Sequence, residues 1–165
     1  MPGLKIYLTA LLTLLLVVPS AALALKQGDP LPELAGPTLE GTEFNISSLK
    51  GQPILLKVGT TWCPTCGQQT QEIDKLRDFL AENGVRYIEV FVQETAKKVR
   101  QFFSKGGHQL PDAVILDQGS IARALNVYVI PRVIMIDKNF QVFRDGNPLT
   151  ATELKNELGK MLTGQ

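Results

Sequence analysis

The chain has 165 residues, of which 44% are hydrophobic and 20% are charged, so it is long and apolar enough for one compact domain with a core. Its 17 Lys and Arg residues nearly balance its 16 Asp and Glu residues, for a formal net charge of +1. A nucleic-acid-binding domain would need a basic face, so this balance argues against a nucleic-acid partner.

Residues 1–24 have the pattern of a secretory signal peptide. Lys5 gives a positive start, an apolar run follows over residues 6–18, and Ala22-Leu23-Ala24 forms an A-x-A cleavage site. We predict cleavage after Ala24. The alternative is an uncleaved anchor that tethers the chain to the membrane, because the run approaches spanning length if a few more residues are included. In either case we expect export, to the periplasm or the outer face of the cytoplasmic membrane.

The remaining chain alternates between strand and helix patterns. Residues 25–37 are rich in Pro and Gly and are predicted to be an extended lead-in, and residues 38–165 are predicted to form the domain. In chain order, we first predict a hairpin around Glu40-Gly41, a helical turn at 47–49, a strand at 53–59 and a helix at 63–81 that stops at Asn83-Gly84. A strand at 85–92 and a helix from Thr95 to Phe103, ended by Gly106-Gly107, follow. The last predicted elements are a strand at 113–116, a helix at 120–125, a hairpin of 133–136 with 141–144, and a closing helix from Thr150 or Thr152. This alternation predicts an α/β fold with helices on both faces of a sheet.

The only two cysteines, Cys63 and Cys66, stand between an apolar run and an amphipathic helical pattern. A thiol at the start of a helix faces unpaired backbone N–H groups and the positive end of the helix dipole. Both favour the thiolate, which is the attacking species. The pattern therefore predicts a redox site, with Cys63 at the mouth of the helix and Cys66 about one turn inside it.

Metal binding and peroxide chemistry are the alternatives for a CxxC pair. Structural zinc usually takes four protein ligands, and this chain has no third cysteine and only one histidine, His108, so no metal site is predicted. A copper chaperone that holds soft Cu(I) through two thiolates stays open. A thiol peroxidase also stays open: Thr60 fits its Pro-x-x-x-Thr-x-x-Cys pattern, but Leu56 stands where that pattern has proline.

The region from about residue 29 to residue 162 resembles the TlpA/ResA-type thiol–disulfide oxidoreductases of bacterial envelopes. The matching pieces are residues 38–44, 49–56, 61–66, 126–131 and 133–139. The resemblance implies a thioredoxin-like fold, with a central mixed sheet, helices on both faces and an N-terminal hairpin extension. It also implies thiol–disulfide exchange with protein substrates. The chain would act as a reductant of the cytochrome c maturation type, fed by a membrane electron donor. It would need no cofactor beyond the Cys63–Cys66 disulfide.

The resemblance also assigns residues to a substrate-binding surface. Pro131 lies between two extended segments, and by itself would be an ordinary trans proline. The family instead places a cis-proline here, beside the cysteines, which leaves the Ile130 backbone free to pair with an extended substrate. Trp62, directly before Cys63, is expected to form a partly exposed wall of this surface. Pro64 suits the first turn of the helix.

Two ionisable residues are candidates for proton transfer or for tuning the pKa of the thiols. Lys57 stands where thioredoxins carry a buried Asp; it is either a lysine whose ammonium reaches solvent or a cation held near the thiols. Glu94 stands where the family keeps an acid that assists proton transfer, or it is a surface acid near a helix N-terminus. We hypothesise that Lys57 and Glu94 form an ion pair beneath the disulfide.

Three further residues are singled out by the pattern around the site. Thr65 replaces a proline common before the second cysteine, and Arg132 follows the expected cis-proline where Thr is common. His108 is predicted to be a loop residue without a partner in its neighbourhood.

Overall fold

The computed structural model describes residues 25–164 and contains a mixed sheet of five strands. The order in the sheet is β5-β4-β3-β6-β7. The strands are β3 (Ile54–Gly59), β4 (Arg86–Val92), β5 (Ala113–Asp117), β6 (Arg132–Ile136) and β7 (Val142–Gly146). The first three are parallel, whereas β6 runs antiparallel to both β3 and β7. This arrangement confirms the predicted mixed sheet.

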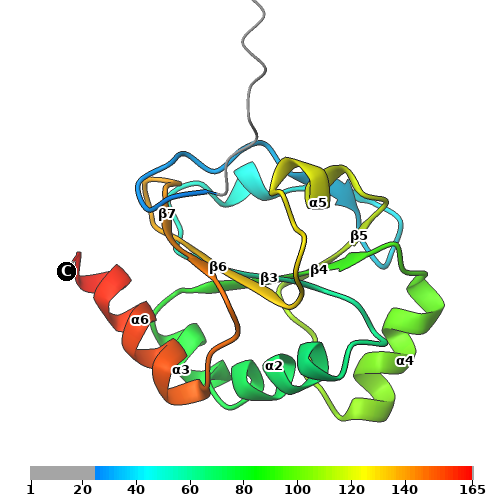
Figure 1. Cartoon of the computed structure of the whole chain (residues 1–165). Coiled ribbons are helices and arrows are strands. Elements are labelled where there is room, and N and C mark those ends of the chain that lie inside the picture. Colours follow the sequence, from blue (N-terminus) through cyan, green and yellow to red (C-terminus); the bar gives the residue numbers. More distant parts are fainter. Residues whose placement is uncertain (1–24, 165) are drawn as a thin grey trace, which may run out of the picture.

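Helices cover both faces of this sheet, as predicted (Figure 1). The helices on one face are α2 (Pro64–Asp74), α3 (Arg77–Glu82), α4 (Ala96–Gly106) and α6 (Ala151–Thr163). The other face carries α5 (Ser120–Ala124) and the short 3-10 helix η1 (Ile46–Leu49). Several end signals act as expected: the side chains of Thr95 and Thr150 cap α4 and α6, and Gly107 ends α4 with a left-handed φ of 65°.

The central strand β3 is buried along its whole length and contributes to the core on both faces. Ile54, Leu56 and Val58 pack into the cluster under η1 and α5, whereas Leu55 packs with residues of α2, α3 and α6. This division follows from the alternation of side chains along a strand. Lys57 shares the face of Leu55 and brings a charge into that layer.

The single helix predicted for residues 63–81 is wrong, because the chain forms two helices there. α2 ends at Asp74, and Leu76 precedes α3 with φ −109° and ψ 8°. At the break the Leu76 N–H bonds to the carbonyl of Ile73, three residues back, which tightens the turn. Ile73, Leu76 and Leu80 are all buried in one cluster. Core packing therefore sets this break, since no glycine or proline lies at it.

The predicted hairpin around Glu40-Gly41 is present. It pairs β1 (Ala35–Pro37) antiparallel with β2 (Glu43–Asn45), and Gly41 adopts a φ of 81° in the turn. A left-handed φ of this kind favours glycine.

The segment before this hairpin, predicted as a lead-in, lies against the sheet. Residues 26–34 bury Leu31 and Leu34 in the core. The backbone carbonyl of Asp29 accepts the N–H of Val142 at 2.8 Å, and an isolated bridge joins Pro30 to Gln141. Thr38, in the turn of the hairpin, bridges Ile115 of β5. The predicted signal peptide, residues 1–24, lies outside the described residues. Within residues 25–164, no helix combines the length and the apolar character needed to span a membrane.

Candidate active site

The two cysteines form a disulfide at the start of α2. Their Cα atoms are 5.2 Å apart. Cys63 is the N-cap residue, and its Sγ accepts the backbone N–H of Cys66 at 3.2 Å, while Pro64 occupies the first turn, where its missing N–H costs nothing. The predicted placement, with Cys63 at the helix mouth and Cys66 within the first turn, is confirmed.

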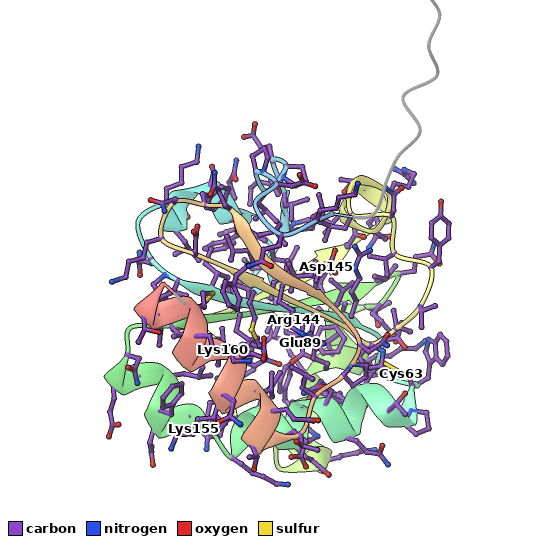
Figure 2. The ribbon with its side chains drawn as sticks, turned by 60° about the vertical axis from the view of Figure 1, so that its left-hand side comes forward. Cys63, Glu89, Arg144, Asp145, Lys155 and Lys160 are labelled. Atoms are coloured by element: carbon purple, nitrogen blue, oxygen red, sulfur yellow. A yellow bond between two sulfur atoms is a disulfide. The ribbon has the colours of Figure 1, made fainter. Side chains whose placement is uncertain are left out.

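Burial distinguishes the two sulfur-bearing residues. Cys63 retains 8% exposure and lies near the edge of the molecule in Figure 2, whereas Cys66 is completely buried. The Thr65 hydroxyl, on an exposed residue, lies 3.3 Å from the Cys63 Sγ. An incoming sulfur atom can therefore reach Cys63, and Cys66 is placed to act only on a sulfur already bound to Cys63.

Large apolar side chains are exposed near this edge. Trp62 is 71% exposed, which confirms its predicted exposure, and Pro64 is also exposed. Tyr128 and Val129 are 90% and 70% exposed; they were missed as surface residues, because the sequence pattern only suggested an extended segment there. Such side chains, standing in water in a folded protein, are typical of an interaction surface.

Pro131 lies where the resemblance places it. The Ile130–Pro131 peptide bond is cis, as predicted. Val58 pairs with Arg132 in the antiparallel register of β3 and β6. Pro131, directly before Arg132, therefore lies beside the end of β3, and the chain continues from that end to Cys63. Ile130 is half-buried, and Pro131 lines a hollow together with Tyr128 and Val129.

Lys57 makes a buried ion pair, but its partner is Glu89 rather than Glu94. Both side chains are 0% exposed, so the alternative that Lys57 reaches solvent is also wrong. The two residues are register partners in the parallel strands β3 and β4, which puts their side chains next to each other on one face. Lys57 Nζ also donates to Thr70 Oγ1 at 2.6 Å.

Tyr87 completes this network on the far side of Glu89. Its hydroxyl donates to Glu89 Oε2 at 2.6 Å. Burial, and then the Glu89 carboxylate, raise the pKa of Tyr87 well above its ordinary value, so the phenol remains a donor. Glu89, Tyr87 and Thr70 were not singled out from the sequence. The sequence did hold one signal for the Lys57–Glu89 pair: each of two neighbouring strands that we predict to be buried contains a charged residue in its middle.

Glu94 is buried, but it binds the loop before the cysteines. Its Oε1 accepts the backbone N–H of Thr61 at 2.9 Å and the Thr61 hydroxyl at 2.6 Å. Its Oε2 is buried without a hydrogen-bond partner and lies 3.8 Å from Lys98 Nζ. Glu94 lies five residues after Glu89, beyond the end of β4, and its side chain does not pair with Lys57. The hypothesis of a Lys57–Glu94 pair is therefore wrong.

A second ion pair lies on the opposite face, beneath the loop that carries Tyr128. Arg132 bonds through its guanidinium to both carboxylate oxygens of Asp145, in a fork geometry. Its Nη1 donates to the backbone carbonyls of Leu125 and Asn126. The side chains are only 11% and 4% exposed. Arg132 thus fixes the start of the loop that leads to Pro131.

His108 is in a loop, as predicted, but it has partners. Its Nδ1 lies 2.9 Å from Asp74 Oδ2, and its ring stacks on Phe102 at 4.9 Å between centroids. The prediction of a histidine without a neighbourhood partner is therefore wrong. Among residues 25–164, no group of three or more His, Cys, Asp and Glu side chains is arranged to hold a metal ion.

Comparison with known sequences finds relatives among thiol–disulfide enzymes. The sequence model of the Redoxin family matches residues 26–158. A "Thiol-disulfide oxidoreductase ResA" of Geobacillus kaustophilus is 27% identical over 140 residues, which cover 84% of this chain and 78% of the relative. A "Thiol:disulfide interchange protein DsbE" of Vibrio cholerae is 32% identical over 109 residues, covering 66% of this chain and 55% of the relative.

Solved structures show the same fold. A thiol:disulfide interchange protein of the thioredoxin family from Chlorobium tepidum superimposes with a TM-score of 0.70 at 24% identity, covering 84% of this chain and 99% of that one. A thiol:disulfide interchange protein from a Bacteroides species gives 0.73 at 17% identity, covering 86% and 93%. At these identities the likeness is one of fold, and it confirms the thioredoxin-like architecture.

Proposed function

This chain belongs to the Redoxin family, and from that premise we propose that its Cys63–Cys66 pair undergoes thiol–disulfide exchange with protein substrates outside the cytoplasm, mainly as a dithiol that reduces their disulfides. The chain is a thiol–disulfide oxidoreductase, like its ResA and DsbE relatives. The observation that carries the proposal is the disulfide at the start of α2, with the Cys63 side reachable and the Cys66 side buried.

The reaction begins with the reduced dithiol. The Cys63 thiolate attacks one sulfur of a substrate disulfide, forming a mixed disulfide and releasing the other substrate sulfur as a thiolate. Cys66 then loses its proton and attacks the Cys63 sulfur, which forms the Cys63–Cys66 bond and expels the second substrate thiolate. The substrate gains two electrons and, after protonation, two thiols, and this protein is oxidised.

The residues around Cys63 support binding of an extended protein segment. Trp62 and Pro64 stand on one side of the disulfide, and Ile130 and Pro131 come from the loop before β6. In the proposed complex the Ile130 backbone pairs with the substrate main chain, while the exposed aromatic side chain of Trp62 packs against its side chains. Recognition through the main chain would suit substrates of varied sequence.

A reductant must be re-reduced after each turnover. We propose that a membrane electron donor supplies the electrons to the Cys63–Cys66 disulfide, and that this disulfide is the sole redox group of the chain. The predicted signal peptide supports an exported location, and the resemblance to the TlpA/ResA-type proteins supports a task such as cytochrome c maturation. In an oxidising compartment, the pair would remain oxidised without such a donor.

Trapping of the mixed disulfide tests the mechanism. The Cys66→Ser variant should accumulate a covalent complex with a protein substrate, visible on a non-reducing gel, because the resolving thiol is absent. The Cys63→Ser variant should form no complex and show no disulfide reductase activity. Gln68→Ala, on the exposed part of α2, is the matched control and should retain full activity. Full activity of Cys63→Ser would reject the proposal.

The reduction potential tests the direction. A value near that of thioredoxin, roughly −270 mV, would support a reductant, whereas a value near that of DsbA, about −120 mV, would make this protein a disulfide donor. The exposed Trp62, next to Cys63, offers a fluorescence signal for this titration. Rapid consumption of peroxide, or tight copper binding without reductase activity, would instead favour the peroxidase or the chaperone.

A further inference from the structure

Beneath the disulfide lies a buried charged network that takes no part in the bond changes of the exchange reaction. We propose that the Lys57 ammonium, held by Glu89 and Thr70, favours the thiolate form of Cys66 in the reduced protein and makes Lys57 a positioning residue for the resolving step. This inference rests on the proposed function. It concerns the buried cysteine alone and assigns the network of Lys57, Glu89, Tyr87 and Thr70 to it.

The first support is the position of Lys57 relative to the buried sulfur. Gly59 lies two residues after Lys57 on the same face of β3. A Cβ added at Gly59 would lie 3.0 Å from Cys66 Sγ and 3.8 Å from Lys57 Cε. The Lys57 side chain and the Cys66 sulfur therefore border the same space below Gly59. This position needs glycine because the sulfur approaches the backbone so closely.

A hydrogen-bond chain also joins Lys57 to the turn that carries Cys66. Lys57 Nζ donates to Thr70 Oγ1 at 2.6 Å, and the same hydroxyl donates to the Cys66 carbonyl at 3.1 Å. Thr70 is completely buried. The ammonium therefore has a fixed position relative to the first turn of α2, in addition to its charge.

The orientation of the pair gives the sign of its effect. Lys57 lies two residues before Gly59 on β3, and its register partner on β4 is Glu89. Tyr87 lies two residues before Glu89 on β4, and so is farther from the disulfide. Glu89 Oε1 binds the ammonium and lies 3.4 Å from the Thr70 hydroxyl, while Glu89 Oε2 is drawn away from the disulfide by the Tyr87 hydroxyl that it accepts. The positive group thus borders the space occupied by Cys66, and a nearby positive charge favours a thiolate.

The surroundings strengthen this electrostatic effect. Lys57 Nζ lies 5.7 Å from the ring centroids of both Phe91 and Phe102, and its side chain has no exposure to water. A charge in such an apolar layer is screened far less than one at the surface.

Other ionisable groups reach this region from neighbouring elements. Glu94 binds the Thr61 backbone in the loop before the cysteines, with Lys98 of α4 nearby. Asp74 of α2 pairs with His108 beyond the Phe102 ring. These groups are common to the wild type and to all the variants below, so differences between those proteins isolate the network.

In the reaction, the charge acts at the second step. The Cys66 thiol must lose its proton to attack the Cys63 sulfur of the mixed disulfide, and that proton passes to water or to the departing substrate thiolate. A Lys57 ammonium beside the developing thiolate raises the fraction of reactive Cys66 at a given pH. Lys57 takes no part in bond formation.

An exchange of the two charges tests the proposal. The variants are Lys57→Glu with Glu89→Lys, which reverses the pair, and Lys57→Met with Glu89→Gln, which removes its charge but keeps an acceptor for Tyr87. Glu72→Gln, a surface change on α2, is the control. Each protein is reduced, and the Cβ resonance of Cys66 is titrated with pH by NMR, with circular dichroism confirming the fold.

We expect the Cys66 midpoint to rise by about one pH unit in the neutral variant, roughly a tenfold loss of thiolate below the midpoint, and to rise further in the reversed variant. Unchanged midpoints in folded variants, or a lower midpoint in the reversed pair, would overturn the proposal. If the reversed variant does not fold, the neutral variant decides. The titration needs no substrate, so its failure is distinct from a wild type that lacks reductase activity.

Discussion

Two buried ion pairs flank the candidate active site, on opposite faces of the same sheet. Lys57–Glu89 lies on the face of α2, with both side chains 0% exposed, and contacts only buried groups behind Cys66. Arg132–Asp145 lies on the face of α5, keeps some exposure, and binds the loop that carries Tyr128 and Pro131. The first pair therefore lies behind the buried sulfur, whereas the second holds the loop of the proposed substrate-binding surface.

The difference follows from residue chemistry as well as from position. A lysine offers a compact charge, and the charge of the buried Lys57 is matched by the single carboxylate of Glu89. An arginine offers five donors in a planar fork, so Arg132 can bind a carboxylate and two backbone carbonyls together. The Lys57–Glu89 pair places a charge near one sulfur atom, and the Arg132–Asp145 pair fixes the conformation of a loop.

The largest effect is expected when the fully buried pair is broken on one side. Lys57→Met alone leaves the Glu89 carboxylate buried without its cation, so the free energy of unfolding should fall by about 3–5 kcal/mol. Urea denaturation measures this loss. The double variant Lys57→Met with Glu89→Gln should recover most of it. Equal stability of the single and double variants would show that Glu89 carries no uncompensated charge.

A smaller effect on stability, but a specific effect on substrates, is expected for Asp145→Asn. The change removes one charge from the fork and should cost about 1–3 kcal/mol. Because Arg132 then holds the loop less firmly, KM for a protein disulfide should rise several-fold, while exchange with a small-molecule disulfide stays at the wild-type rate. Equal losses with both substrates would place the effect of Asp145 on the cysteines instead of the loop.

The smallest effect is expected for a surface carboxylate that joins two helices. The bond from Lys75, and then the backbone N–H of Ala151 at the start of α6, lower the pKa of Glu72 below its ordinary value of 4.5. The lowered pKa means that Glu72 stabilises the fold above that value and that this contribution disappears as the pH falls through the lower, folded pKa.

Thermal melts should therefore show wild type and Glu72→Gln converging in acid. The difference should be largest near neutral pH and vanish in strong acid, where Glu72 is protonated in both the folded and unfolded states. A constant difference across the whole range would show that the ionisation of Glu72 is not involved. Compared with the two buried pairs, Glu72 shows how much a solvated charge contributes to the stability of the fold.

Much of this architecture could be predicted from local sequence, since the signals involved are local. The strand that precedes the cysteines is apolar, Thr95 and Thr150 are side-chain caps, and Gly107 ends a helix in a conformation that favours glycine. The position of Cys63 at the helix mouth followed from the same reasoning. The cis form of Pro131 came only from the family resemblance, because an isolated X–Pro bond favours trans.

The errors arose where contacts between distant segments decide. The hypothesis paired Lys57 with Glu94 because Glu94 stands where the family keeps an acid, but the register of two parallel strands pairs Lys57 with Glu89. No local signal ends α2 at Asp74, and core packing sets the break before α3. The exposure of Tyr128 was likewise hidden, because an apolar residue next to a strand pattern is usually buried.

The N-terminal segment crosses the sheet from one side to the other, and this path bears on self-association. It bonds to Val142 at the start of β7 through Gly28 and Asp29, and then bridges Ile115 of β5 through Thr38. These two strands are the edges of the five-stranded sheet. Edge strands with unpaired backbone groups invite pairing with another molecule. Residues 26–38 therefore cover part of both edges, and we expect a domain shortened to begin after Thr38 to leave more backbone groups of β5 and β7 open to pairing with another molecule.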